Sequence, residues 1–563
     1  TIPLSLLGTA ALMLAFGFSL NLLTLLAMVL AIGLVVDDAI VVVENIHRHI
    51  EEGLSPIKAA LIGTREIIGP VIAMTITLAA VYTPIGLMGG LTGALFKEFA
   101  FTLAGSVIVS GVVALTLSPM MSSRLLSSKL SESKTAQKVE RSMERLTSGY
   151  SALLDKTLAR RLSVLVVGVT ILGLIYVLFS GARSELAPQE DMGYLFVQPK
   201  APQYANIDYT KKYSKEVEAL FHDIPEFSGS FFLVGGENSA NVGFGGIILD
   251  EWEDRTRSAD DIQAELTGSL SQVTGVYTSV FQDSPLPAST GGLPVQMVIR
   301  SPGSFSEVHG VLQGLVGAAW GSGLFAFVDS DLAFDSPGAN INIDRAKAAD
   351  LGVSMSEIAA TLAILMGENY EDRFNWFDRS YDVIAQAQLD SRLTLDDLAG
   401  FYVRNDHNEL LPLSTFVSFT ETQQANSLPQ FNQMNSATLS GVLMPGVTMG
   451  QAVEFLQSQQ LPSDMTVDWM SNSRQYVQEG NRLITSFAFA MVVIFLVLAA
   501  QFESFRDPFV ILVTVPLAIC GALIPLYLGY TTLNIYTQIG LVTLIGLISK
   551  HGILMVSFAN DIQ

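Results

Sequence analysis

The sequence lacks several features that drive chemistry in other proteins. Its single cysteine, Cys520, cannot form a disulfide or a cysteine-based zinc site within one chain, and we interpret it as a small buried apolar residue. The sequence contains no G-x-x-x-x-G-K-[S/T] phosphate loop, no G-x-S-x-G nucleophile elbow and no H-E-x-x-H zinc motif. These absences argue against an ATP-driven pump or a hydrolytic enzyme of these kinds, and we expect neither a cofactor nor a metal.

Positive charge is also scarce, and it is unevenly distributed. The chain has 31 Lys and Arg against 53 Asp and Glu, for a net charge of −22. Residues 184–481 carry 14 basic and 39 acidic residues, whereas the rest of the chain carries 17 and 14. A strongly acidic block repels phosphate backbones, so nucleic acid is not expected as a partner.

Long apolar runs are abundant, since half of the residues are hydrophobic. About 20 apolar residues suffice for a helix that crosses a bilayer. We predict seven complete spans and a first, truncated one, near residues 1–17, 22–44, 69–88, 99–122, 163–181, 483–501, 508–529 and 535–558. Because the chain begins at Thr1 within an apolar run and ends just past another, we expect an internal part of a longer membrane protein.

The distribution of basic residues between the spans predicts the orientation. The short loop after the second span and the loop 125–161 are rich in Lys and Arg, and basic loops stay in the cytoplasm. The acidic block 183–481 then falls on the opposite side. Within the basic loop, apolar residues recur at helical spacing, which predicts an amphipathic helix on the membrane surface or, alternatively, one packed on protein: Val139, Met143, Leu146, Tyr150, Leu153 and Leu158.

The acidic block is typical of mixed α/β structure. Strand-like runs such as "YLFVQPK" and "SGSFFLVGG" alternate with helix-like runs such as "IDYTKKYSKEVEALFHDI". This alternation indicates βαβ units in two-layer subdomains. The predicted fold class is therefore a polytopic α-helical membrane protein with a large α/β region.

An internal repeat links the two ends of the chain. When the sequence is laid over itself with Pro3 on Pro516, the first apolar segments align without a gap on the last ones. Proline, glycine, asparagine and threonine positions coincide, and such matches are difficult to obtain from composition alone. The matched pairs are Pro3 with Pro516, Gly8 with Gly521, Asn21 with Asn534, Thr24 with Thr537, and Gly33 with Gly546.

The register of this repeat accounts for two acidic residues within a predicted span. Asp37 and Asp38 of "GLVVDDAIVVVEN" align with Lys550 and His551. A carboxylate at the bilayer centre costs at least about 2.5–3.5 kcal/mol, so it is usually functional and paired. In a two-fold pseudosymmetric bundle the equivalent helices face each other, which predicts that the carboxylates lie opposite Lys550. Two acids that share one base hold an excess negative charge, which favours protonation over a static pair.

Four motifs together resemble one transporter family. "GLVVDDAIVVVEN", "GLISKHGILMVSFAND", "LAPQEDMGYLFVQ" and "INIDRAKAADLGVSMSEI" are similar to the resistance–nodulation–division (RND) exporters, hydrophobe/amphiphile efflux branch. The resemblance covers the whole chain. It implies a proton-driven secondary transporter of small amphiphilic substrates, in which Asp37, Asp38 and Lys550 match the proton-relay positions.

The resemblance also implies location, partners and domains. Such pumps are homotrimers in the bacterial inner membrane, and they work with a periplasmic adaptor (membrane fusion) protein and an outer-membrane channel. The implied domains are transmembrane helices at 1–124, a cytoplasmic loop helix at 125–161, a transmembrane helix at 162–182, a periplasmic porter subdomain at 183–291, a second porter subdomain at 292–340 and 430–481, a docking subdomain at 341–429, and three transmembrane helices at 482–563.

The resemblance suggests a substrate pocket but also points to departures from the family. Phe232 matches a pocket phenylalanine of multidrug members, and Val234 and Phe244 are further candidates. Glu237, Asn238 and Ser239 stand where more aromatics would be expected, which predicts a narrower or more polar substrate range. His551 replaces the usual amide-type neighbour of the lysine; it either tunes the relay or has only a local partner.

Three other functions remain open from the sequence. A heavy-metal exporter of the same superfamily would use soft methionine ligands, of which the candidates are Met297, Met355, Met434, Met444 and Met470. A protein-export factor of related fold is disfavoured by the long second block. A receptor or scaffold with the same fold would hold the buried charges statically.

Overall fold

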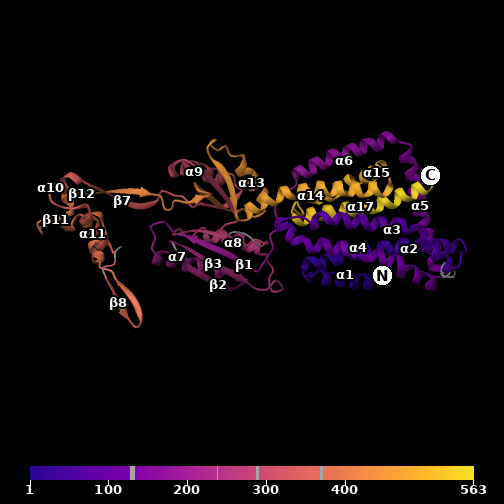
Figure 1. Cartoon of the computed structure of the whole chain (residues 1–563), viewed down its shortest axis with the longest axis horizontal. Helices are drawn as coiled ribbons and strands as arrows, with labels where there is room; N and C mark the ends of the chain where they lie inside the picture. The colour runs from indigo at the N-terminus through magenta and orange to yellow at the C-terminus, as the bar shows by residue number, and fades with distance from the viewer. Residues whose placement is uncertain (127–133, 237–238, 287–290, 368–369, 371, 563) are drawn as a thin grey trace.

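The computed structural model describes residues 1–126, 134–236, 239–286, 291–367, 370 and 372–562. It is elongated, with a helical bundle at one end and α/β units extending away from it (Figure 1). The bundle contains both ends of the chain. Its helices are α1 (Ile2–Phe16), α2 (Leu22–Glu51), α3 (Pro56–Gly86), α4 (Gly90–Leu125), α5 (Lys134–Leu158), α6 (Arg161–Gly181), α14 (Ser471–Phe502), α15 (Arg506–Leu512), α16 (Val515–Tyr527) and α17 (Ile535–Ile562).

Six helical segments among the described residues are long and apolar enough to cross a membrane, which confirms a polytopic membrane protein. They are Leu22–Glu51, Pro56–Gly86, Gly90–Leu125, Leu162–Gly181, Arg506–Tyr527 and Ile535–Ala559. The two other predicted spans correspond to shorter apolar helical stretches, Ile2–Phe16 and Ala488–Phe502. Helix α3 begins at Pro56, well before the predicted start of its span, because hydropathy detects only the apolar part of a helix that continues through polar residues.

The predicted span 508–529 is divided into α15 and α16 at Val513–Thr514. Pro516 lies in the first turn of α16, where its missing N–H costs nothing, whereas in the middle of a longer helix it would remove a hydrogen bond. Pro3 occupies the same place in α1. Proline thus lies in the first turn of both aligned helices.

The helix starts and caps reproduce the predicted repeat. Helix α2 begins at residue 22 and α17 at residue 535, so these two starts are separated by the same offset as Pro3 and Pro516. Asn21 accepts a hydrogen bond from the backbone N–H of Thr24 at 2.9 Å, and Asn534 accepts the same bond from Thr537 at 3.0 Å. Each threonine hydroxyl accepts in turn from the asparagine N–H, at 2.9 and 2.8 Å. Helices α2 and α17, which carry the aligned positions Asp38 and His551, therefore start with the same reciprocal cap.

The first α/β unit follows α6. Its sheet has the strand order β2-β3-β1-β4, formed by β1 (Tyr194–Lys200), β2 (Phe227–Gly236), β3 (Ser239–Leu249) and β4 (Tyr277–Phe281), with helices α7 (Ile207–Ala219) and α8 (Ala259–Leu270). The predicted β-α-β order is confirmed, but β3 pairs between β1 and β2, so every neighbouring pair is antiparallel. The buried side chains of the sheet pack against the two helices.

The second α/β unit is built from two separate chain segments. Its five-stranded sheet contains β5 (Val295–Ser301), β6 (Phe325–Ser330), β13 (Gln430–Phe431), β14 (Met434–Leu443) and β15 (Thr466–Met470). Helices α9 (Phe305–Gly321) and α13 (Met449–Ser458) complete its core. Strand β14 pairs with both β5 and β6 and joins the two segments.

A distal unit is inserted between these segments, at the end of the molecule remote from the bundle (Figure 1). The chain enters and leaves it through the paired strands β7 (Ser336–Ile343) and β12 (Val417–Gln424). It has a small core of its own. Its other elements are α10 (Arg345–Asp350), α11 (Met355–Met366), β8 (Asp372–Trp376), β9 (Arg379–Val383), α12 (Leu395–Ala399), β10 (Tyr402–Arg404) and β11 (Leu410–Pro412).

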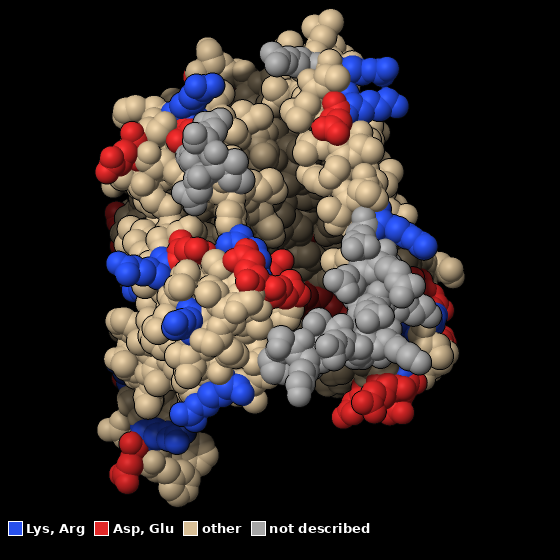
Figure 2. All heavy atoms as spheres, turned by 90° about the vertical axis from the view of Figure 1, so that its right-hand side faces the viewer, with Lys and Arg blue, Asp and Glu red and all other residues tan. Residues whose placement is uncertain are grey.

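The opposite end of the bundle carries the charged loops. Figure 2 views this end and shows Lys, Arg, Asp and Glu side chains gathered around a hollowed face. Helix α5 lies here; its apolar residues Met143, Leu146, Tyr150, Leu153 and Leu158 are all exposed. The side chain of Val139, a further member of the predicted apolar stripe, lies outside the described part. An exposed apolar stripe suits contact with a membrane surface.

Candidate functional site

Two buried charges join the repeated helices inside the bundle. Asp38 on α2 is 1% exposed and Lys550 on α17 is 2% exposed. Lys550 Nζ lies 2.8 Å from Asp38 Oδ1. The predicted contact across the repeat is therefore present, and it links two helices from opposite ends of the chain.

Polar groups from the helices complete the surroundings of this pair. Ser110 on α4 donates a hydrogen bond from Oγ to Asp38 Oδ2 at 3.1 Å. Lys550 Nζ donates to the backbone carbonyl oxygen of Leu34 at 3.2 Å. Oδ2 of the buried carboxylate thus has a hydrogen bond and Oδ1 has the ion pair with Lys550.

Asp37 lies farther from Lys550 than Asp38 does. Its Oδ2 lies 3.8 Å from Lys550 Nζ, and its side chain is 43% exposed. One ammonium group therefore faces two carboxylates of very different accessibility. The cluster has an excess negative charge that a proton could neutralise, and Asp37 is the more accessible of the two acids.

His551 does not join this cluster. Its side chain is exposed, and Nδ1 lies 3.0 Å from the carbonyl oxygen of Leu547 one turn earlier on α17. The structure thus favours the interpretation in which His551 has a local partner over the one in which it tunes the relay.

The predicted pocket residues are not brought to one place. Phe232 packs in the helix-covered core against Phe221, with ring centroids 5.8 Å apart, and Val234 points to the same side of the sheet. Phe244 lies on the other face, 6.1 Å from Phe231. The reason is the alternation of side chains along a strand: Phe244 pairs with Leu233, so residues 232 and 234 face away from it.

The other face of this sheet carries two phenylalanines beside Phe244 that were not predicted, Phe196 and Phe281, and they pack against Phe327 and Val442 of the second α/β unit. Phe244 lies 5.2 Å from Phe196, which in turn lies 5.8 Å from Phe281, ring centroid to ring centroid. The signal was available in the sequence as the alternation of residues along β1. Ser239 is described and half-buried, whereas Glu237 and Asn238, on which the predicted polar substrate range partly depends, lie outside the described residues.

The candidate soft-metal ligands do not form one set. Met297 is fully buried in the core of the second α/β unit. Met355 lies on α11 of the distal unit. Two ligands of one metal ion must be a few ångströms apart, so these methionines do not act together.

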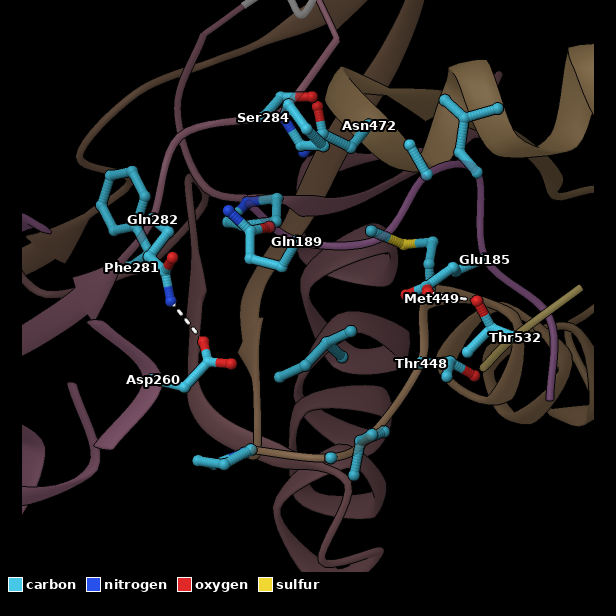
Figure 3. Close-up of a pocket in the computed structure, with 18 of the residues that line it drawn as sticks. Glu185, Gln189, Asp260, Phe281, Gln282, Ser284, Thr448, Met449, Asn472 and Thr532 are labelled. Carbon is cyan, nitrogen blue, oxygen red and sulfur yellow. Dashed lines mark hydrogen bonds between the residues drawn. The ribbon is translucent and has the colours of Figure 1, made fainter. Parts of the chain in front are cut away.

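A cavity of about 350 Å³, with polar and apolar side chains in its lining, lies where the α/β units meet the bundle. Figure 3 shows side chains from several elements around it, among them Glu185, Gln189, Gln282 and Thr532. Gln282 donates to Asp260 at 2.6 Å, and Thr532 donates to Glu185. Burial raises the pKa of the Glu185 carboxyl, and the hydrogen bond from Thr532 partly lowers it.

A second cavity, of about 660 Å³ and mostly apolar, adjoins the first. Its lining comes from α3, α6, α13, α14, α16 and α17, and it includes Glu185 and Leu186, which also line the first cavity. A volume of this size suits a drug-sized molecule. Glu185 therefore lines both cavities, at the junction of the bundle and the α/β units.

Comparisons with known proteins agree with this architecture. The family model for AcrB/AcrD/AcrF matches residues 1–563. The chain is 43% identical over 571 residues to an uncharacterized transporter of Haemophilus influenzae, covering all of this chain and 55% of that protein. It is 31% identical to the toluene efflux pump membrane transporter TtgB of Pseudomonas putida and 30% identical to the multidrug export protein AcrF of Escherichia coli, covering all of this chain and 55% and 56% of those proteins.

The chain thus spans about half the length of these curated relatives. The match nevertheless extends over every residue of the chain, from the first helix through the α/β units to α17. The protein belongs to the AcrB/AcrD/AcrF family of RND efflux transporters.

Proposed function

We propose that this protein is a proton-driven exporter of hydrophobic and amphiphilic small molecules in a bacterial inner membrane. The observation that supports this most strongly is the Asp38–Lys550 pair, which is buried between the repeated helices of a membrane bundle. The names of two relatives, a toluene efflux pump and a multidrug export protein, support export of such compounds.

In the proposed mechanism, Asp37, Asp38 and Lys550 carry the proton. Protonation of Asp38 removes its attraction to the ammonium group 2.8 Å away, so α2 and α17 are free to move relative to each other. Loss of the proton on the other side restores the pair. Each proton that crosses a potential of about 100 mV releases about 2.3 kcal/mol, which drives the cycle.

The proposed topology places the α/β units in the periplasm and residues 125–161 in the cytoplasm. The α/β units and helix α5 lie at opposite ends of the bundle, in accord with the distribution of basic residues (Figure 1). The first and second α/β units are the proposed porter subdomains and the distal unit the docking subdomain. By resemblance to the family, we propose a homotrimer that works with a periplasmic adaptor and an outer-membrane channel.

The proposal is tested by proton flux in vesicles. The protein from the complete coding sequence is reconstituted, a pH gradient is imposed, and export of the lipophilic dye Nile red is followed together with lumenal pH. The variant Asp38→Asn keeps the shape of the side chain but cannot carry a proton, and it should abolish both signals. Glu44→Gln is the matched control, because Glu44 is exposed on the same helix. Gradient-driven export by Asp38→Asn at the wild-type rate would refute the proposal, and a wild type without proton flux would favour a receptor or scaffold.

A further inference from the structure

The segment between α6 and β1 is bonded to the start of α17. The backbone N–H of Leu533 donates to the carbonyl of Arg183 at 2.7 Å, and the N–H of Glu185 donates back to Leu533 at 3.1 Å. The N–H of Ile535, the first residue of α17, donates to the carbonyl of Leu186 at 3.1 Å. A short parallel pairing thus joins the two segments.

The side chain of Glu185 adds a bond to this backbone pairing. Thr532 donates from its hydroxyl to Glu185 Oε1, and Figure 3 shows the two side chains pointing toward each other. Glu185 is half-buried and lines both cavities. Ser184, the preceding residue, shares a hydrogen bond of 2.9 Å with the hydroxyl of Tyr476 on α14.

The other end of the same segment is held by the first α/β unit. Asp191 accepts two hydrogen bonds from the guanidinium of Arg255, at 2.9 and 3.1 Å, and one from the N–H of Ala259 at 2.8 Å. Gln189 donates to the carbonyl of Asp283 at 2.7 Å. The segment between α6 and β1 is therefore hydrogen-bonded to the start of α17 at one end and to the first α/β unit, near β4 and α8, at the other.

Helix α17 connects this fastening to the buried pair. Lys550 lies about four turns after Ile535 on a continuous helix, which corresponds to about 22 Å along its axis. We propose that Glu185 is a positioning residue that couples movement of the Lys550 helix to the first α/β unit. This inference rests on the proposed proton-driven export.

The repeat supplies an internal comparison. Ser19 occupies the position equivalent to Thr532, and it donates to Glu98 Oε2 at 3.0 Å. Asn21 donates to the same oxygen at 2.7 Å. Glu98, however, lies on α4 within the bundle, whereas Glu185 lies on a segment that leads into a strand. The loop before α2 and the loop before α17 are thus each hydrogen-bonded to a glutamate. Of these two glutamates, only Glu185 lies on a segment that continues into an α/β unit.

The test compares variants of both ties in the reconstituted protein from the complete coding sequence. Glu185→Leu and Thr532→Val each remove the hydrogen bond, Glu185→Gln keeps an acceptor oxygen, and Ser19→Ala removes the equivalent bond of the first repeat. The readout is Nile red exported per proton moved. We expect about a tenfold fall in this ratio for the first two variants, the factor that a hydrogen bond to a carboxylate can supply, while Glu185→Gln and Ser19→Ala stay near wild type.

A double variant tests whether Glu185 and Thr532 act through one shared bond. If the two side chains act through one bond, Glu185→Leu with Thr532→Val should be no worse than either single variant. A ratio equal to wild type in both single variants would overturn the inference, as would an equal fall of dye export and proton flux that follows loss of folded protein. A wild type that moves no protons would instead overturn the proposed function, and the inference with it.

Discussion

Removing the charges at the buried pair, singly and together, distinguishes a proton relay from a static ion pair. Lys550→Met leaves Asp38, 1% exposed, without its counter-ion. Breaking a buried pair by removing one partner typically costs about 3–5 kcal/mol. Asp38→Asn should cost less than this, because Asp37 remains 3.8 Å from the ammonium group and the amide oxygen can still accept from Ser110.

The triple variant Asp37→Asn, Asp38→Asn, Lys550→Met removes all three charges together. The cost of Lys550→Met comes from a buried carboxylate left without its counter-ion, and the triple variant has no such carboxylate, so it should regain most of the lost stability. Glu44→Gln, on the exposed side of α2, should leave stability unchanged. Thermal unfolding of the purified variants in detergent measures their stabilities relative to the wild type.

Transport then decides between the two roles. A relay needs a titratable group at these positions, so the triple variant should fold and export nothing. A static pair needs only a stable helix contact, so the triple variant should export as the wild type does. Drug efflux above background by the stable triple variant, in a host without other pumps, would refute the relay.

Three further predictions concern the rest of the molecule. With Cys520 replaced by Ser, a membrane-impermeant thiol reagent added to intact spheroplasts should label Ser391→Cys in the distal unit but not Ser148→Cys in α5; the reverse result would contradict the topology. Tyr150→Trp should fluoresce further to the blue in lipid nanodiscs than Ser148→Trp, because residue 150 belongs to the exposed apolar stripe; equal spectra would argue against membrane contact. Hydrogen bonds from Arg257 hold the pKa of the Glu226 carboxyl below its usual range, so this pair stabilises the fold fully above the unfolded pKa of about 4.3. The stability advantage of the wild type over Glu226→Gln should therefore vanish as the pH falls through the lower folded pKa. A stability advantage that does not change with pH would contradict the pairing.

The repeat and its central contact could be predicted from sequence because both depend on position alone. The alignment that places Pro3 on Pro516 also places Asp37 and Asp38 on Lys550 and His551, and facing helices bring aligned positions near each other. The contact between Asp38 and Lys550 follows from that symmetry without knowledge of any side-chain conformation. The same reasoning cannot find Ser110, which reaches Asp38 from α4, a helix outside the aligned stretch.

Other parts of the site depend on details that periodicity does not contain. The division of Phe232 and Phe244 between two faces of a sheet follows from the pairing of β2 with β3, and a shift of one residue would reverse it. The hydrogen bond between Glu185 and Thr532 joins residues 347 positions apart. Helix ends were also predicted too short, because the helices extend past their apolar parts into polar sequence.

The comparison of the two repeats suggests how protonation of the buried pair could act on the first α/β unit. The aligned helices α2 and α17 start with the same asparagine–threonine cap, so each begins as a firmly ordered helix rather than a frayed end. In the proposed coupling, a displacement at Asp38 or Lys550 is carried along the helix to the loop before it. At α2 that loop is tied to Glu98 within the bundle, whereas at α17 it is tied to Glu185 on the segment that enters β1. Equal movements of α2 and α17 would thus act on different parts of the molecule, because the start of α2 is bonded to the bundle and the start of α17 to the segment that enters the first α/β unit.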